Sequence, residues 1–195
     1  MAKRNPKPDS RKQSILDAAE RMARDGGYHD VSFRRIADDV GIKSASVFHH
    51  FASKEELGAA VARRYTDRFM EVIGDPYDAS LSANEKLARY CDAYRHAQKI
   101  DSRMCLCGML GAEISSLPGD VAKEVRRFFD LNIDWLEAAL TPARDKPSKR
   151  YDARSKAVMV LSALEGAIIV ARATGDASLF DQVADYLSIP AAKAI

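Results

Sequence analysis

The strongest constraint on the fold of this chain is a glycine, Gly41, that separates two short runs of residues with helical spacing. Phe33, Ile36, Ala37 and Val40 precede it at the 3.6-residue period of an α-helix. Glycine adopts a positive φ without steric cost, so Gly41 can end a helix and turn the chain sharply. The pattern predicts two short helices joined by a tight turn.

The segment that follows the turn reads GIKSASVFHHF over residues 41 to 51. Ile42, Val47 and Phe51 are the apolar positions that hold a short helix against its neighbours, and the polar residues between them face outward. Upstream, the same spacing predicts a helix over residues 15 to 25, ended by the two glycines that come next. Three such helices form a helix-turn-helix domain, in which the second helix of the pair enters the DNA major groove.

The stretch VSFRRIADDVGIKSASVFHHFASKEEL, residues 31 to 57, resembles the tetracycline-repressor (TetR) family of bacterial transcriptional regulators. The resemblance is close over residues 10 to 60 and elsewhere concerns length and helical layout. It implies an all-α fold, with a three-helix helix-turn-helix DNA-binding domain followed by a larger helical ligand-binding and dimerisation domain. We expect a flexible basic arm over residues 1–9, the DNA-binding domain over 10–54 and the larger domain over 55–195.

The resemblance also implies which side chains meet DNA. Lys54 matches the family's phosphate-binding lysine at the start of the fourth helix, whereas by itself a lysine before two glutamates is simply solvated. Phe48 replaces the family's usual tyrosine, and it either touches a thymine methyl or packs. Lys43 and Ser44 also depart from the usual pattern, which leaves the base preference open. The residues predicted to bind DNA are Ser32, Arg34, Lys43, Ser44, Ala45, Ser46, Phe48, His49, His50 and Lys54.

Charge and composition agree with contact to DNA at one end of the chain. Residues 1–54 hold eleven Lys or Arg against seven Asp or Glu, a net charge of +4, whereas the remainder carries −2. A polar amino terminus predicts no signal peptide, and the apolar segment 157–171 is expected to be too short and interrupted to span a bilayer. We therefore expect a cytoplasmic protein without membrane contact. No zinc-ligand spacing, phosphate loop or nucleophile elbow is visible, so neither a cofactor nor a metal is expected.

The remaining pattern is helical throughout. A helix capped by Asn84, another over 105–116 and a polar loop over 141–150 are expected. Residues 157–171 are apolar almost all round and need burial on both faces. The resemblance implies that residues 152–188 form a four-helix dimer interface. The residues predicted at that interface are Val158, Leu161, Glu165, Ile168, Val183 and Leu187.

A ligand pocket is expected among the aromatic residues, with core packing as the alternative role for each. Residues 104–113, MCLCGMLGAE, resemble a Gly-Cys-Leu-x-Gly-Asn-Leu segment in a TetR branch that includes an acrylate-responsive regulator. On one helix Cys105 and Cys107 diverge by about 200°, so a disulfide between them would require local unwinding, whereas Met109 and Glu113 share the face of Cys105. The residues predicted to bind the ligand are Tyr90, Tyr94, Cys105, Met109, Glu113, Phe128 and Trp135.

These features predict a ligand-responsive DNA-binding regulator, not an enzyme. We expect a homodimer that represses at a palindromic operator on double-stranded DNA and leaves it when a small-molecule inducer binds. One alternative keeps the fold and makes modification of Cys105, by redox chemistry or an electrophile, the trigger. The other is a cysteine-dependent enzyme that uses Cys105 and Cys107 with His96 or Glu113. Three cysteines do not form the even disulfide framework of a secreted protein.

Overall fold

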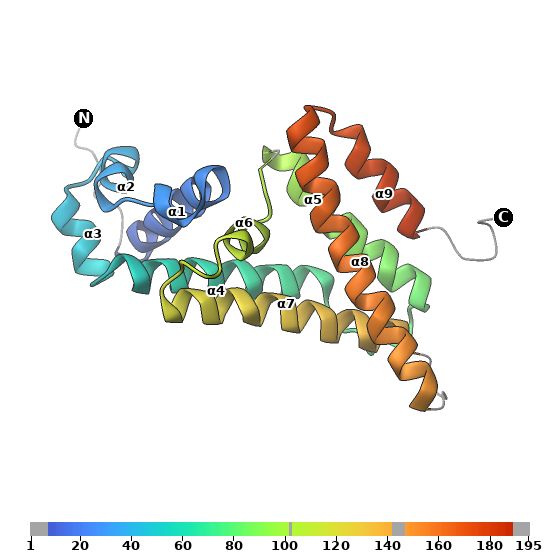
Figure 1. The fold of residues 1–195 in the computed structure, drawn as a ribbon. Coiled ribbons are helices and arrows are strands. Elements are labelled where there is room, and N and C mark those ends of the chain that lie inside the picture. Colours follow the sequence, from blue (N-terminus) through green and yellow to red (C-terminus); the bar gives the residue numbers. More distant parts are fainter. Residues whose placement is uncertain (1–7, 102, 142–146, 189–195) are drawn as a thin grey trace. The chain divides into compact units, whose positions relative to one another are not determined.

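The computed structural model describes residues 8–101, 103–141 and 147–188, which form helices and no strand (Figure 1). The all-α prediction is confirmed. In chain order the helices are α1 (Pro8–Asp30), α2 (Phe33–Val40), α3 (Ser44–His50), α4 (Lys54–Ile73), α5 (Ala83–Asp101), α6 (Leu106–Ala112), α7 (Gly119–Leu140), α8 (Pro147–Thr174) and α9 (Ser178–Ser188).

The chain divides into two compact units. The first unit contains residues 1–65 and 106–126, and the second contains residues 66–105 and 127–195. This division differs from the predicted break after Lys54, because α6 packs against α1 and so joins the helix-turn-helix residues. Sequence spacing does not report such a contact between segments that lie eighty residues apart.

Two glycines shape the first unit. Gly41 ends α2 with φ 71° and ψ 39°, as predicted. Gly27, with φ 77°, kinks α1 without ending it, because the helix continues to Asp30. Around these turns Ile36, Val47 and Phe51 are at most 2% exposed. The three short apolar runs therefore share one small core, as a helix-turn-helix domain requires.

The start of α5 differs from the prediction by two residues. Ser82, not Asn84, caps the helix. The Glu85 N–H donates to Ser82 Oγ at 3.3 Å, and the Ser82 N–H donates to Glu85 Oε2 at 2.7 Å. This reciprocal pair is a capping box, and its Ser-x-x-Glu pattern is readable in the sequence.

Two further boundaries also move. α6 covers only Leu106–Ala112, so the prediction of a helix over 105–116 was too long at both ends. Cys105 and Glu113 lie outside the helix, and the predicted common face with Met109 does not exist. The expected polar loop over 141–150 is shorter, because α8 already begins at Pro147.

In the second unit α9 packs against both α5 and α8. Arg95 of α5 binds the carboxylates of Asp181 and Asp185 at 2.9 and 2.6 Å, and it also pairs with Asp92 of its own helix. Phe180 is 3% exposed and lies in the core. α9 is thus fixed to α5 by apolar burial and by one shared guanidinium.

α8 is longer than the apolar segment that predicted it. The most apolar 18-residue window of Ala153–Thr174 has a mean hydropathy of 1.7, and by length and composition alone this helix could cross a membrane. The core helix of a globular protein meets the same criterion, so this observation does not overturn the prediction for residues 157–171. Because 39% of its most apolar window is buried inside the protein, one face of α8 serves as a core helix.

Candidate functional site

The surface of α3 carries most of the side chains predicted to meet DNA. Val47 is fully buried and anchors this seven-residue helix. Lys43, Ala45, Phe48 and His49 are exposed, while Ser44, Ser46 and His50 are half-buried. The helix therefore presents a continuous outer face of the kind that enters a major groove.

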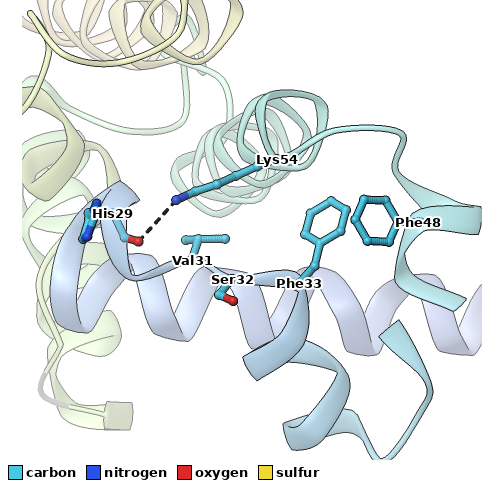
Figure 2. A pocket seen from close by; sticks show the side chains of 6 residues that line it. All are labelled: His29, Val31, Ser32, Phe33, Phe48 and Lys54. Carbon is cyan, nitrogen blue, oxygen red and sulfur yellow. Dashed lines mark hydrogen bonds between the residues drawn. The ribbon is translucent and has the colours of Figure 1, made fainter. Parts of the chain in front are cut away.

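An open depression of about 380 Å³ lies beside α3 (Figure 2). The rings of Phe33 and Phe48, which both line it, meet edge to face with centroids 4.7 Å apart, yet Phe48 remains 57% exposed. The Phe48 ring thus packs against Phe33 and is also accessible from outside. Sequence reasoning missed Phe33 as a surface residue because its helical spacing assigned it to the core. The lining residues are His29, Val31, Ser32, Phe33, Phe48 and Lys54.

Lys54, the first residue of α4, points its ammonium group toward the end of α1 (Figure 2). Nζ donates a hydrogen bond to the His29 carbonyl oxygen at 3.2 Å and lies 4.5 Å from the centroid of the Tyr28 ring. Burial lowers the pKa of Lys54, and the carboxylates of Asp30 and Glu113 oppose that shift. The ammonium group is therefore held in place at a helix amino terminus.

The same helix end is capped by its own side chains. The Glu56 N–H donates to Ser53 Oγ at 3.0 Å, and Glu56 Oε2 accepts from the Ala52 N–H at 2.8 Å. Capping fixes where α4 starts and directs the positive end of its dipole toward the surface that carries Lys54. A fixed helix amino terminus beside a lysine suits a phosphate group.

His50 lies in positively charged surroundings. Partial burial lowers the pKa of His50, and the charges of His49, Arg11 and Lys12 lower it further. Lys12 also lies over the Phe51 ring, 5.5 Å from its centroid. Both basic residues belong to α1, whereas Lys3, Arg4 and Lys7 of the expected basic arm lie outside the described residues.

The two arginines at the start of α2 differ in their surroundings. Arg34 is exposed, as a backbone contact requires. Arg35 pairs with Asp30, whose carboxylate lies 3.0 Å from its guanidinium, and donates to the Asp30 carbonyl at 3.1 Å. Ser32 precedes α2 as its N-cap residue and is half-buried at the depression.

The second unit brings together four of the predicted ligand residues. Tyr90, Tyr94, Phe128 and Trp135 are each at most 4% exposed. Phe69, which sequence reasoning missed, joins them, and the ring centroids of this aromatic cluster lie 5.1 to 5.8 Å apart. The cluster is densely packed, so the predicted residues also serve as core.

Glu165, predicted at the dimer interface, turns toward this cluster. Tyr94 Oη donates to Glu165 Oε1 at 3.0 Å, and the Cys105 thiol also donates to the carboxylate. Burial raises the pKa of Glu165 against these two hydrogen bonds. A signal for such a role was present, since Glu165 is the one acidic residue in the apolar segment 157–171.

The other predicted ligand residues are separated. Cys105 belongs to the second unit and Met109 and Glu113 to the first. Glu113 Oε2 accepts a hydrogen bond from the Tyr28 N–H at 2.9 Å. A side chain at Gly27 would collide with the same carboxylate. Glu113 therefore ties the segment after α6 to the last turn of α1.

The three cysteines are all buried and form no disulfide. Cys105 is 2% and Cys107 0% exposed, and burial raises the pKa of Cys91. Among residues 8–101, 103–141 and 147–188, no group of three or more His, Cys, Asp or Glu side chains could hold a metal ion.

The outer face of α8 differs from the predicted interface. Leu161 and Ile168 are each 3% exposed and belong to the core of their own unit. Val183 and Leu187 of α9 are half-buried, and Val158 alone among the predicted set is well exposed, at 43%. We define the outer apolar face as the exposed apolar side chains Val158, Met159, Ile169 and Val170 of α8 with Tyr186 of α9.

Two family models match the sequence. Residues 15–61 match the family described as bacterial regulatory proteins, tetR family. Residues 83–186 match the C-terminal domain of LmrA/YxaF-like transcriptional regulators. The two matches fall on the helix-turn-helix residues and on most of the second unit.

Curated relatives match mainly through the amino-terminal part. The HTH-type transcriptional repressor AcnR of Corynebacterium diphtheriae is 37% identical over 71 residues, which cover 36% of this chain and 37% of that protein. The HTH-type transcriptional repressor KstR2 of Mycolicibacterium smegmatis is 35% identical over 103 residues, 48% of each chain. The matches thus span less than half the length of these relatives.

Solved structures match nearly the whole chain. A TetR transcriptional regulator from Legionella pneumophila has a TM-score of 0.82 and 34% identity over 96% of this chain and 97% of its own. A TetR family regulator from Agrobacterium tumefaciens has the same TM-score and 29% identity over 93% and 97%.

Proposed function

The chain belongs to the TetR family of bacterial transcriptional regulators, and on that premise we propose that it binds a palindromic operator as a homodimer and represses transcription until a small-molecule inducer releases it. The observation that supports this most strongly is the exposed face of α3 beside the lysine-bearing amino terminus of α4. Relatives that match the chain include the repressors AcnR and KstR2 and also an activator, FasR of Mycolicibacterium smegmatis. The choice of repression follows the first two.

The proposed contacts divide by chemistry. Lys54, His50, Arg34 and Ser32 supply charge or hydrogen-bond donors to phosphates, which position the protein on the duplex. Lys43, Ser44, Ala45, Ser46, Phe48 and His49 lie on the face that meets base edges. No metal or cofactor takes part in this proposal.

A homodimer gives the two α3 helices a fixed separation. Two recognition helices about 34 Å apart engage successive major grooves on one side of the duplex, so the operator is roughly palindromic. The outer apolar face is the surface we assign to the second copy, because its side chains are 43–71% exposed on helices whose other faces are already packed. The same contact accounts for the apolar length of α8 without a membrane.

Release requires that the inducer bind one dimer geometry more tightly than another. In the chain, α6 is preceded by Cys105, which contacts Glu165, and followed by Glu113, which accepts the Tyr28 N–H. We infer that displacement of Cys105 by a ligand is passed along α6 to the last turn of α1. Both the thiol-sensor and the enzyme alternatives need an accessible thiolate, and the burial of Cys105 and Cys107 argues against them.

Selection of bound sequences from a random DNA pool tests this function directly. The purified protein is mixed with the pool at two salt concentrations, and the bound fraction is sequenced. We expect a palindrome with half-sites about one helical turn apart, and weaker binding at higher salt because phosphate contacts release counterions. The absence of any enriched sequence would remove the basis for the proposal.

Replacement of Lys54 should weaken binding to every DNA sequence alike. Lys54→Ala removes one phosphate contact, so we expect about tenfold weaker binding, ~1.4 kcal/mol, and a salt slope smaller by about 0.9. Lys123→Ala, which removes an exposed lysine of α7, is the control and should change neither. Fluorescence anisotropy with specific and random duplexes measures both quantities. A loss confined to the specific duplex would show that Lys54 reads bases.

Replacement of Phe48 should affect one thymine in each half-site. An exposed ring supported edge to face by Phe33 can contact a thymine methyl, so Phe48→Ala should cost about 1–3 kcal/mol at that position. The matched test replaces the selected thymine by uracil, which lacks only the methyl group. Native protein should lose affinity for the uracil duplex, and Phe48→Ala should bind both duplexes equally. Unequal binding by the variant would assign the methyl contact to another residue.

Operator affinity should rise as the pH falls. The pKa of His50 lies below its ordinary value in the free protein, so the ring is neutral above neutral pH. A phosphate nearby raises that pKa, and binding then takes up about one proton. Affinity should increase by at most about tenfold per pH unit until the pH falls below the pKa of the free protein, where the dependence ends. Titration between about pH 5.5 and 8 should show this, and His50→Gln should flatten the curve.

A further inference from the structure

The aromatic cluster of the second unit contains one buried oxygen whose hydrogen-bonding capacity is unused. Glu165 Oε1 accepts the Tyr94 hydroxyl at 3.0 Å, whereas Oε2 has no contact with solvent and accepts no hydrogen bond from the described residues. The neighbouring polar groups are satisfied, since Tyr90 Oη donates to Asn132 Oδ1 at 2.6 Å and Asn132 Nδ2 donates to the Phe128 carbonyl at 2.7 Å. A buried acceptor without a donor carries a free-energy cost.

The two buried glutamates of the first unit each have an arginine beside the carboxylate. Glu20 is 8% exposed and pairs with Arg64 at 2.9 Å, and Glu124 is 6% exposed and pairs with Arg63 at 2.7 Å. Glu165 differs, because no Lys, Arg or His among the described residues pairs with it. The Glu165 carboxylate is stabilised by two neutral hydrogen-bond donors, the Tyr94 hydroxyl and the Cys105 thiol, and by no positive charge among the described residues.

We propose that the ligand of the second unit is an organic amine with an apolar aromatic body, whose ammonium N–H donates to Glu165 Oε2 while its body packs among the rings of Tyr90, Tyr94 and Phe69. This inference names the ligand class of the proposed inducer and rests on that proposed function. An ammonium group supplies both features that Glu165 lacks, a hydrogen-bond donor and an opposite charge.

The rings around the carboxylate favour the same class of ligand. The negative faces of aromatic rings attract a cation, so ring–ring contacts at 5.1 to 5.7 Å can be exchanged for ring–cation contacts on binding. Burial raises the pKa of Glu165 in the free protein, and an ammonium group favours the ionised carboxylate. Carboxylate ligands should bind poorly, because the Glu165 carboxylate repels a second anion. Acrylate is such an anion, and the resemblance of residues 104–113 concerned a branch with an acrylate-responsive regulator.

The test uses the full-length protein without DNA and three matched sets of probes. 2-Phenylethylamine and tryptamine are the cations, 2-phenylethanol and tryptophol their neutral counterparts, and 3-phenylpropionate and acrylate the anions. Binding is measured by calorimetry and by the shift in Tm. We expect each amine to bind at least tenfold more tightly than its alcohol, and the anions not to bind.

Glu165→Gln keeps an acceptor for Tyr94 and removes the charge, so it should reduce amine affinity at least tenfold, to that of the alcohols. Glu71→Gln, an exposed glutamate of the same unit, is the matched control and should bind amines as the native protein does. The proposal is overturned if no amine binds more tightly than its alcohol, if Glu165→Gln leaves amine binding unchanged, or if the anions bind preferentially. The binding test contains no DNA, so its result is independent of the operator selection. If the protein selects a palindrome but binds no amine, the proposed ligand class is wrong and the proposed function is not affected.

Discussion

Replacing Ile169 by glutamate should separate the dimer and remove operator binding. Ile169 belongs to the outer apolar face and is 53% exposed, so we expect the substitution to leave the fold of one subunit intact. In a dimer it would place two like charges in an apolar contact. A monomer holds one half-site at a time and loses the second, linked contact, so operator affinity should fall by about 10²–10⁴-fold.

Sedimentation velocity and operator titration at matched concentrations measure the two effects. Ala79→Glu adds the same charge at an exposed position in the loop between α4 and α5, and it should remain dimeric and bind the operator normally. Circular dichroism checks that both variants are folded. A dimeric Ile169→Glu protein would show that the second copy does not lie on the outer apolar face.

Truncating Phe128 should cost about 3–5 kcal/mol of unfolding free energy. Its ring is fully buried and contacts Phe69 and Phe129 at centroid distances of 5.8 and 5.4 Å. Phe128→Ala therefore removes the transfer free energy of a large ring and leaves a cavity in a densely packed cluster.

Tryptophan fluorescence measures the stability of the Phe128→Ala variant. Trp135, the one tryptophan, is 4% exposed and stacks on Tyr90 at 5.5 Å, so its fluorescence reports unfolding of the second unit. Phe48→Ala is the matched control, since that ring is 57% exposed and its loss should change stability by no more than about 0.5 kcal/mol. A cost below about 1 kcal/mol for Phe128→Ala would show that the cluster can collapse around the missing ring.

Local signals made the first unit predictable. A glycine with positive φ, an apolar residue on every turn and a short polar face are properties of a few neighbouring residues, and Gly41, Val47 and Phe51 behave as those properties require. The ten side chains for which the resemblance implies DNA contact are all exposed or half-buried in the structure.

Long-range packing accounts for what the sequence did not predict. α8 is apolar on nearly all sides, so its pattern could not tell the inner face from the outer one. As a result Leu161 and Ile168 were assigned outward and Met159 and Val170 were missed. The direction of Glu165 depends in the same way on residues of α5 that lie seventy positions away.

The division of the chain has a consequence for engineering hybrid regulators. A helix-turn-helix segment cut out as residues 1–65 would lack residues 106–126, which belong to the same compact unit. It would then lack the carboxylate that accepts the Tyr28 N–H and the α6 surface that covers α1. A hybrid regulator that joins this DNA-binding unit to another ligand-binding domain would therefore need both segments. The unit that can be exchanged is encoded by two separate stretches of the gene.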